Sequence, residues 1–149
     1  MTHVPWLVTM TLALGLLAGC GGKSSSPTAA TPPPSSQEVE PNDVTPQALG
    51  TLGSTDIVFA GSCSSASDVD LFSVVVPSST NVFVSTSWTG ASDLDLAVLN
   101  SAKVFLNAQD TGVNPEQCTL GPLAAATYII RVTEKSAAAT PYTLTIGAR

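Results

Sequence analysis

Oxygen-bearing side chains are concentrated in one short stretch of this 149-residue sequence. Glu38, Glu40, Asn42 and Asp43 fall within six residues, and Asp68 and Asp70 lie further along, just before an alternating apolar run. Hard cations such as Ca²⁺ take six to eight oxygen ligands from carboxylates, amide carbonyls, backbone carbonyls and water. The pattern therefore predicts either a calcium site or a solvated acidic loop, and composition alone favours the loop.

The charge distribution excludes some partners. The formal net charge is −6, with five basic and eleven acidic residues. No Lys or Arg lies between Lys23 and Lys103. An acidic chain without a basic cluster argues against nucleic-acid binding and offers no polybasic segment for anionic lipid. We therefore expect no nucleic-acid partner.

A second carboxylate pair, Asp93 and Asp95, raises the question of catalysis. Residues two apart on a strand face the same way, and paired carboxylates carry out glycoside hydrolysis. The sequence offers few other candidate catalytic residues, because the only histidine is His3 and there is no Gly-x-Ser-x-Gly motif. We expect a structural role for the pair and no enzyme activity, with a small carboxylate-based hydrolase as the less favoured alternative.

The residues after 36 alternate between apolar and polar with a period of two, which is typical of half-buried strands. Turn-forming residues separate the runs at Pro77-Ser78-Ser79, Gly90-Ala91-Ser92, Asn114-Pro115, Gly121-Pro122 and Pro141. The pattern predicts an all-β domain, an antiparallel, jelly-roll-like β-sandwich of about seven or eight strands. The runs are 55–61, 71–76, 82–88, 93–98, 128–133 and 142–146.

The N-terminal segment reads as a targeting signal. Residues 6–18 form an apolar run too short to span a bilayer but suited to a signal peptide. Its ending, Leu17-Ala18-Gly19-Cys20, resembles the lipobox of bacterial lipoprotein precursors. The resemblance implies a signal peptide over 1–19 and a Cys20 that carries palmitate-type acyl chains, which would anchor the chain to a membrane. Gly21, in place of Asp, indicates the outer membrane of a bacterial envelope.

Residues 20–36 are rich in Gly, Ser and Pro, so we expect a linker between the lipid and a folded domain over 37–149. Two cysteines, Cys63 and Cys118, remain in that domain. An exported location permits a disulfide, which would stabilise the domain by about 4 kcal/mol on the chain-entropy model. We predict the bridge, with two free buried thiols as the alternative.

Four motifs in the domain resemble bacterial pre-peptidase C-terminal domains. The acidic run 38–43, with Gly61 and then residues 68–72 (Asp-Val-Asp-Leu-Phe), resembles the opening of that family. Residues 93–96 (Asp-Leu-Asp-Leu) are similar to its mid-domain strand. Residues 127–132 and 142–144 are similar to its two closing strands, so the resemblance covers about 37–149.

The resemblance implies a β-sandwich of the kind appended to secreted proteases, similar to the collagen-binding domains of clostridial collagenases. By motif match, the calcium ligands would be Glu38, Glu40, Asn42, Asp43, Asp68 and Asp70. The implied function is a non-catalytic, membrane-anchored binding or adhesive module with a protein or polysaccharide ligand. The alternative is a structural or accessory lipoprotein that partners a secreted protease or an envelope complex.

Overall fold

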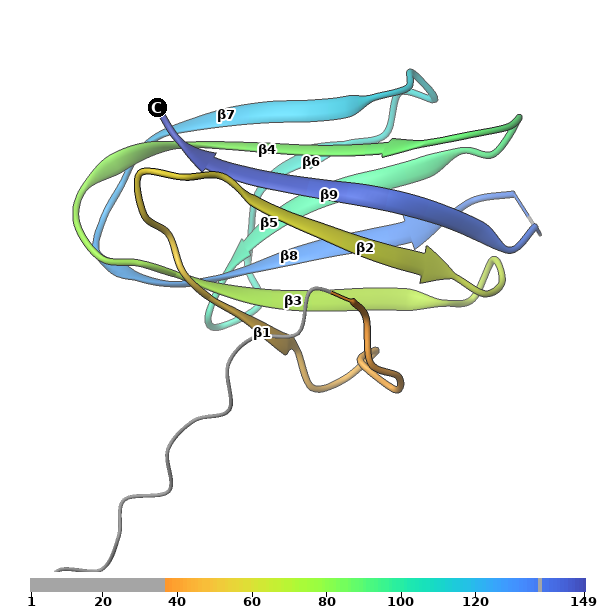
Figure 1. The fold of residues 1–149 in the computed structure, drawn as a ribbon, viewed down its shortest axis with the longest axis horizontal. Coiled ribbons are helices and arrows are strands. Elements are labelled where there is room, and N and C mark those ends of the chain that lie inside the picture. The colour runs from red at the N-terminus through yellow and green to blue at the C-terminus, as the bar shows by residue number, and fades with distance from the viewer. Residues whose placement is uncertain (1–36, 137) are drawn as a thin grey trace, which may run out of the picture. The chain divides into compact units, whose positions relative to one another are not determined.

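The computed structural model describes residues 37–136 and 138–149. This part of the chain forms nine β-strands and contains no helix (Figure 1). The strands are β1 (Gln47–Thr51), β2 (Ile57–Cys63), β3 (Val69–Val76), β4 (Thr80–Trp88), β5 (Leu94–Asn100), β6 (Phe105–Gln109), β7 (Glu116–Leu123), β8 (Ala126–Glu134) and β9 (Thr140–Ala148).

The strands form two sheets that pack face to face as a β-sandwich, which confirms the predicted fold class (Figure 1). The five-stranded sheet has the order β1-β3-β8-β5-β6, and the four-stranded sheet has the order β2-β9-β4-β7. Neighbouring strands are antiparallel except for β1, which pairs with β3 in parallel. Within each sheet, most neighbours in space are therefore distant in sequence.

The core lies between the sheets and is built by the predicted alternation. In β8, Tyr128, Ile130 and Val132 belong to the central cluster, while Arg131 and Ile129 point to the outer face. Successive side chains of a strand point to opposite faces of the sheet, so alternation in sequence becomes an inner and an outer surface. Trp88 is also a core residue, as expected, and its indole N–H donates to the carbonyl oxygen of Ser92 at 2.8 Å.

The strand boundaries differ from the sequence prediction in three places. There are nine strands where we expected seven or eight, and β1, β6 and β7 correspond to none of the predicted runs. The short strands β1 and β6 lie at sheet edges and show no clean alternation, and β7 contains Gly121-Pro122, which we predicted as a turn. Gly121-Pro122 lies inside β7 and Pro141 inside β9, where we predicted turns. β7 is an edge strand, where the missing amide hydrogen of proline is tolerated. Pro141 lies near the start of β9, just before the stretch that pairs with β4 begins at Tyr142.

The predicted disulfide is wrong, because Cys63 and Cys118 are both free, buried thiols. Cys63 ends β2 and Cys118 lies in β7, and these strands are opposite edges of the four-stranded sheet. Three strand spacings separate them, about 14 Å across the sheet. A disulfide needs Cα atoms within about 7 Å, so this strand order excludes the bridge.

The signal peptide, the lipidation of Cys20 and the linker all fall on residues 1–36, outside the described part of the chain. Among the described residues, no helix is long and apolar enough to cross a membrane.

Candidate functional site

The acidic segment 38–43 is held against the end of β2. Gln37 forms an isolated parallel bridge with Ala60, and the Glu38 amide donates to the Ala60 carbonyl at 3.1 Å. One oxygen of the Glu38 carboxylate accepts the Ser62 amide hydrogen at 2.6 Å. Because the segment is fixed beside β2, its carboxylates lie close to those of Asp68, just before β3, and Asp70, the second residue of β3.

Five of the six predicted ligands are carboxylates, and the fold gathers all five. Glu38, Glu40 and Asp70 form one group, and Glu40, Asp43 and Asp68 form a second. Within each group, one oxygen per residue lies within 4.8 Å of the others. Since Glu40 belongs to both groups, the five carboxylates make one continuous acidic cluster, which we call the acidic site.

Asn42, the sixth predicted ligand, joins the acidic site from within the same segment. Its side-chain amide donates to Glu38 at 2.7 Å, and its backbone amide donates to Glu40 at 3.0 Å. The carbonyl oxygen Oδ1 of Asn42 and the carboxylate oxygen Oδ1 of Asp70 are both buried without a hydrogen-bond partner. Unpartnered buried oxygens are costly, and a hard cation bound by oxygens would remove that cost. The donor set therefore fits a calcium ion.

Asp70 is the most deeply buried carboxylate of the acidic site. It is fully inaccessible to solvent, and its other oxygen, Oδ2, accepts hydrogen bonds from the Tyr142 hydroxyl at 2.6 Å and the Cys63 thiol at 3.2 Å. Burial raises the pKa of Asp70 to about 7, although these two hydrogen bonds act in the opposite direction. Burial and the Asp70 charge also raise the pKa values of Tyr142 and Cys63, so both donors keep their protons at neutral pH.

The more exposed carboxylates of the acidic site influence one another's pKa values. Burial raises the pKa of Glu40, and the negative charges of Glu38, Asp68 and Asp43 add to the effect. For Asp68, burial is the largest single influence and acts upward, but hydrogen bonds led by the Ser64 amide bring its pKa below the ordinary value. The acidic site thus holds one carboxylate that is readily ionised beside two that resist ionisation.

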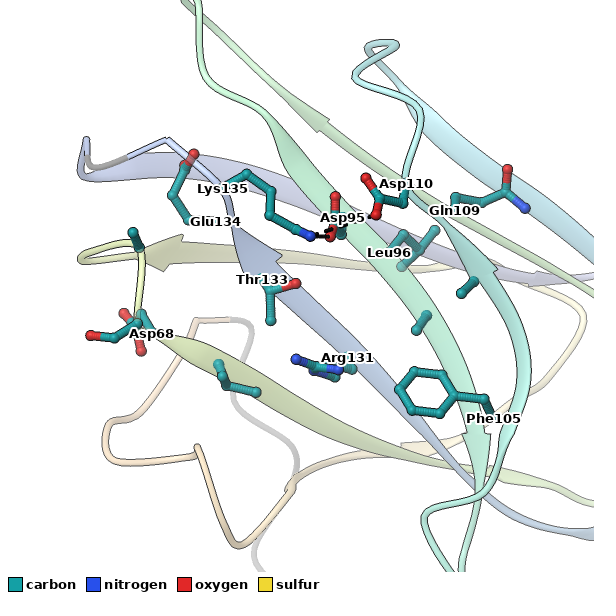
Figure 2. Close-up of a pocket in the computed structure, with 15 residues that line it drawn as sticks. Asp68, Asp95, Leu96, Phe105, Gln109, Asp110, Arg131, Thr133, Glu134 and Lys135 are labelled. Carbon is teal, nitrogen blue, oxygen red and sulfur yellow. Dashed lines mark ion pairs between the residues drawn. The ribbon is translucent and has the colours of Figure 1, made fainter.

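Asp93 and Asp95 do not form a carboxylate pair of the kind expected in a glycosidase. Asp95 Oδ2 forms an ion pair with Lys135 Nζ at 2.6 Å on the outer face of the five-stranded sheet (Figure 2). Asp93 precedes β5, and its backbone carbonyl accepts the Lys135 amide hydrogen at 2.8 Å. These contacts tie the start of β5 to the end of β8, which is the structural role that we expected.

Comparison with known proteins agrees with this architecture. Residues 68–134 match the family model of the bacterial pre-peptidase C-terminal domain. This part of the chain is similar to a pre-peptidase C-terminal domain. The matched segment runs from the start of β3 to the end of β8, so it includes Asp68 and Asp70 but not the acidic segment before β1.

Solved structures show the same fold at low sequence identity. The pre-peptidase C-terminal domain of a Bacillus anthracis collagenase aligns with a TM-score of 0.57 and 13% identity, over 68% of this chain and 95% of that chain. The Aeromonas hydrophila protein PliG, a periplasmic inhibitor of g-type lysozyme, aligns with a TM-score of 0.50 and 14% identity, over 68% and 99%. The Yersinia pseudotuberculosis-derived mitogen aligns with a TM-score of 0.51 and 11% identity, over 64% and 86%. No curated protein matches the sequence.

Sequence reasoning identified the ligand candidates of the acidic site but missed the partners of Asp70. Tyr142 was predicted only as part of the last strand, and Cys63 as half of a disulfide or, in the alternative, as a free buried thiol. Tyr142 is 72 residues from Asp70 in sequence. Its ring lies against Gly61 of the neighbouring strand β2, and its hydroxyl reaches Asp70 of β3 in the other sheet. The one sequence signal was Gly61, whose missing side chain leaves room for the Tyr142 ring.

Proposed function

We propose that this protein is a non-catalytic, lipid-anchored binding module of the bacterial cell envelope whose β-sandwich is stabilised by calcium. The observation that carries the calcium part is the pair of buried, unpartnered oxygens of Asn42 and Asp70 at the acidic site. In the absence of a cation, the site keeps mutually repelling carboxylates close together and leaves these oxygens without a donor. Calcium bound by the six predicted ligands would satisfy both features at once.

The chemistry of the other candidate residues supports a non-catalytic role. The Asp95 carboxylate is engaged with Lys135, and both thiols are buried. Burial raises the pKa of Cys118 to about 11, and the pKa of Cys63 is raised further by burial and by Asp70. Since the thiolate is the nucleophile, neither cysteine is activated for covalent chemistry.

The anchor rests on Cys20 and the preceding Leu17-Ala18-Gly19. In a bacterial host, metabolic labelling with a palmitate analogue should mark the full-length protein, and Cys20→Ser should abolish the label and release the protein from the membrane fraction. Labelling that persists in the variant would contradict the lipoprotein assignment. Separation of the two membranes by density would then test the outer-membrane location.

Calcium binding is tested by thermal unfolding of chain 21–149 in excess EDTA and in millimolar calcium. A ligand that binds only the folded state stabilises it by RT ln(1 + [L]/Kd), which is about 2.7 kcal/mol at a hundredfold excess over Kd. We expect the melting temperature to rise by several degrees in calcium and the rise to disappear in Glu40→Gln. Asp110→Asn removes an exposed carboxylate outside the acidic site and should keep the full rise. No rise in the wild-type chain would remove calcium from the proposal.

A second candidate, an accessory lipoprotein that acts with a partner enzyme, keeps the same anchor and fold. It is favoured by the likeness of the sandwich to a domain of a collagenase and to an inhibitor of a lysozyme. Both candidates need a binding surface for a protein or polysaccharide ligand, and they differ in whether that ligand is an enzyme.

A further inference from the structure

Three consecutive apolar side chains are exposed at the edge strand β6. In the described part of the chain, β6 is the last strand of the five-stranded sheet and pairs with β5 alone. Val104, just before β6, and Phe105 and Leu106, its first two residues, are 57%, 53% and 43% exposed. No Lys, Arg, Asp or Glu lies between Lys103 and Asp110. An edge strand presents unpaired backbone N–H and C=O groups, so an uncharged, apolar edge favours pairing with another strand.

The other three sheet edges are protected against such pairing. At β2, the Glu38 amide donates to the Ala60 carbonyl at 3.1 Å, and the Glu38 carboxylate accepts the Ser62 amide hydrogen at 2.6 Å. β7 contains Pro122, which has no amide hydrogen to donate. β1 is interrupted by a register shift at Gly50, whose φ is 99°. Covering segments, prolines and bulges are the means by which proteins protect sheet edges, so among the described strands β6 is the edge that remains available.

A register shift against β5 determines which side chains of β6 share a face. Phe105 lies opposite Leu99, and Ala108 lies opposite Ala97. Leu99 and Ala97 both belong to the small apolar cluster on the outer face of the sheet, separate from the main core. Residues opposite each other on neighbouring strands share a face. Phe105 and Ala108 therefore both lie on the outer face, because the shift inserts the extra residue Leu106 into β6.

We propose that β6 pairs in the antiparallel direction with β6 of a second copy of this chain, so that two domains form a dimer about a two-fold axis. One register places Phe105 of each copy opposite Ala108 of the other, and the same register places Lys103 of each copy opposite Asp110 of the other. A large side chain then meets a small one, and a cation meets a carboxylate. Each contact occurs twice, as a two-fold interface requires.

The faces of the side chains select this register. A shift by one residue would place Phe105 opposite Gln109, whose partner on β5 is the core residue Leu96. Phe105 and Gln109 lie on different faces, so they cannot be opposite each other in a regular pair. The arrangement of large, small and charged residues along β6 thus complements itself, which is why a second copy fits this edge.

The two charged residues at the ends of β6 are exposed and available for such a contact. Lys103 Nζ donates to the Val44 carbonyl at 2.9 Å, which leaves further N–H donors of its ammonium group. Asp110 lies 3.6 Å from Lys135, which is paired more closely with Asp95 at 2.6 Å. Because β6 has five residues, the interface is small and we expect weak, concentration-dependent association. The inference goes beyond the proposed function, because neither calcium nor the lipid anchor takes part in the pairing.

The test is sedimentation equilibrium of chain 21–149 from micromolar to millimolar concentration, in EDTA to exclude association through bound calcium. We expect a monomer–dimer equilibrium without larger species, because the two-fold pairing uses the β6 edge of both copies. Lys103→Glu places two carboxylates together at both ends of the interface, and Asp110→Lys places two cations together. Each single variant should weaken the dimer by about tenfold, and the double variant, which exchanges the two charges, should restore it. Asp56→Lys makes the same charge change as Asp110→Lys on a loop before β2 and should leave the dimer unchanged.

Weaker association in both single variants, with recovery in the double variant, supports the proposal. A monomer at every concentration overturns it, as does a series of species larger than the dimer. Association that the single variants leave unchanged assigns the contact to another surface and also overturns it. Failure of the double variant to recover overturns the antiparallel register. The substituted side chains at positions 103 and 110 are exposed, so unchanged Trp88 fluorescence should show that each variant is folded.

Discussion

Asp70 links the stability of this domain to pH in a direction opposite to that of most carboxylates. Its pKa is about 7 in the folded protein without a cation, against an ordinary value of 3.8. Between these two pH values, the folded state binds a proton that the unfolded state has lost. The free energy of unfolding therefore falls as pH rises through this window in EDTA, whereas a salt-bridged carboxylate with a lowered pKa gives the reverse.

The size of the effect follows from the shift. One pKa unit corresponds to 1.36 kcal/mol, so the free energy of unfolding falls by at most about 1.4 kcal/mol for each pH unit in the window and by about 4 kcal/mol in total. Glu40 contributes with the same sign because its pKa is also raised. Asp68 and Glu134 have lowered pKa values, so their contributions change only in more acidic solution, below the ordinary range of carboxyl groups.

The assay is urea unfolding of chain 21–149 at pH values from 5 to 7.5, followed by the fluorescence of Trp88, which is the only tryptophan in that chain and is buried. In EDTA, we expect stability to fall with pH, and Asp70→Asn to remove most of the slope. In calcium, the slope should weaken or reverse, since the metal binds the ionised carboxylates and competes with protons.

Asp56→Asn is the matched control, because Asp56 is paired with Arg149 at the surface and has a lowered pKa. It should leave the slope between pH 5 and 7.5 unchanged. Stability that is flat or rises over this range in EDTA, or a slope that survives in Asp70→Asn, would refute the assignment of a raised pKa to Asp70.

Two further predictions concern the thiols and the packing around Tyr142. Cys63 and Cys118 are buried and unbridged, so Ellman's reagent should find no reactive thiol in native chain 21–149 and two after unfolding. For the same reason, a reducing agent should leave the melting temperature unchanged. One thiol or none after unfolding would contradict the strand order. Gly61→Ala should lower the free energy of unfolding in urea by about 1–3 kcal/mol, because a Cβ there would lie 2.4 Å from Cζ of the buried Tyr142 ring. Gly53→Ala, where a Cβ meets nothing within 4 Å, should be neutral or slightly stabilising, and equal effects of the two substitutions would show that the ring yields freely.

The sequence alone was sufficient to predict the central strands and the sandwich. Each central strand buries one face against the other sheet, so apolar and polar residues alternate along it and the pattern can be recognised from that strand's sequence alone. These strands are β3, β4, β5, β8 and β9. The candidate ligands were also predictable, because 38–43 is a local cluster and its family resemblance is carried by short motifs. The edge strands β1, β6 and β7 were missed. β1 and β6 are less buried and keep less of the pattern, and β7 contains Gly121-Pro122, which signals a turn.

Only the tertiary structure decided which distant residues meet. The order β2-β9-β4-β7 places the two cysteines at opposite edges of one sheet, and no feature of their sequence neighbourhoods specifies that order. Packing of the two sheets brings the Tyr142 hydroxyl to Asp70, and the register of β5, β6 and β8 aligns two alanines with Arg131. Strand formation depends on local side-chain burial, whereas strand order and register depend on the whole chain packing one core. The raised pKa of Asp70 is therefore a property of the fold, although every residue that causes it is visible in the sequence.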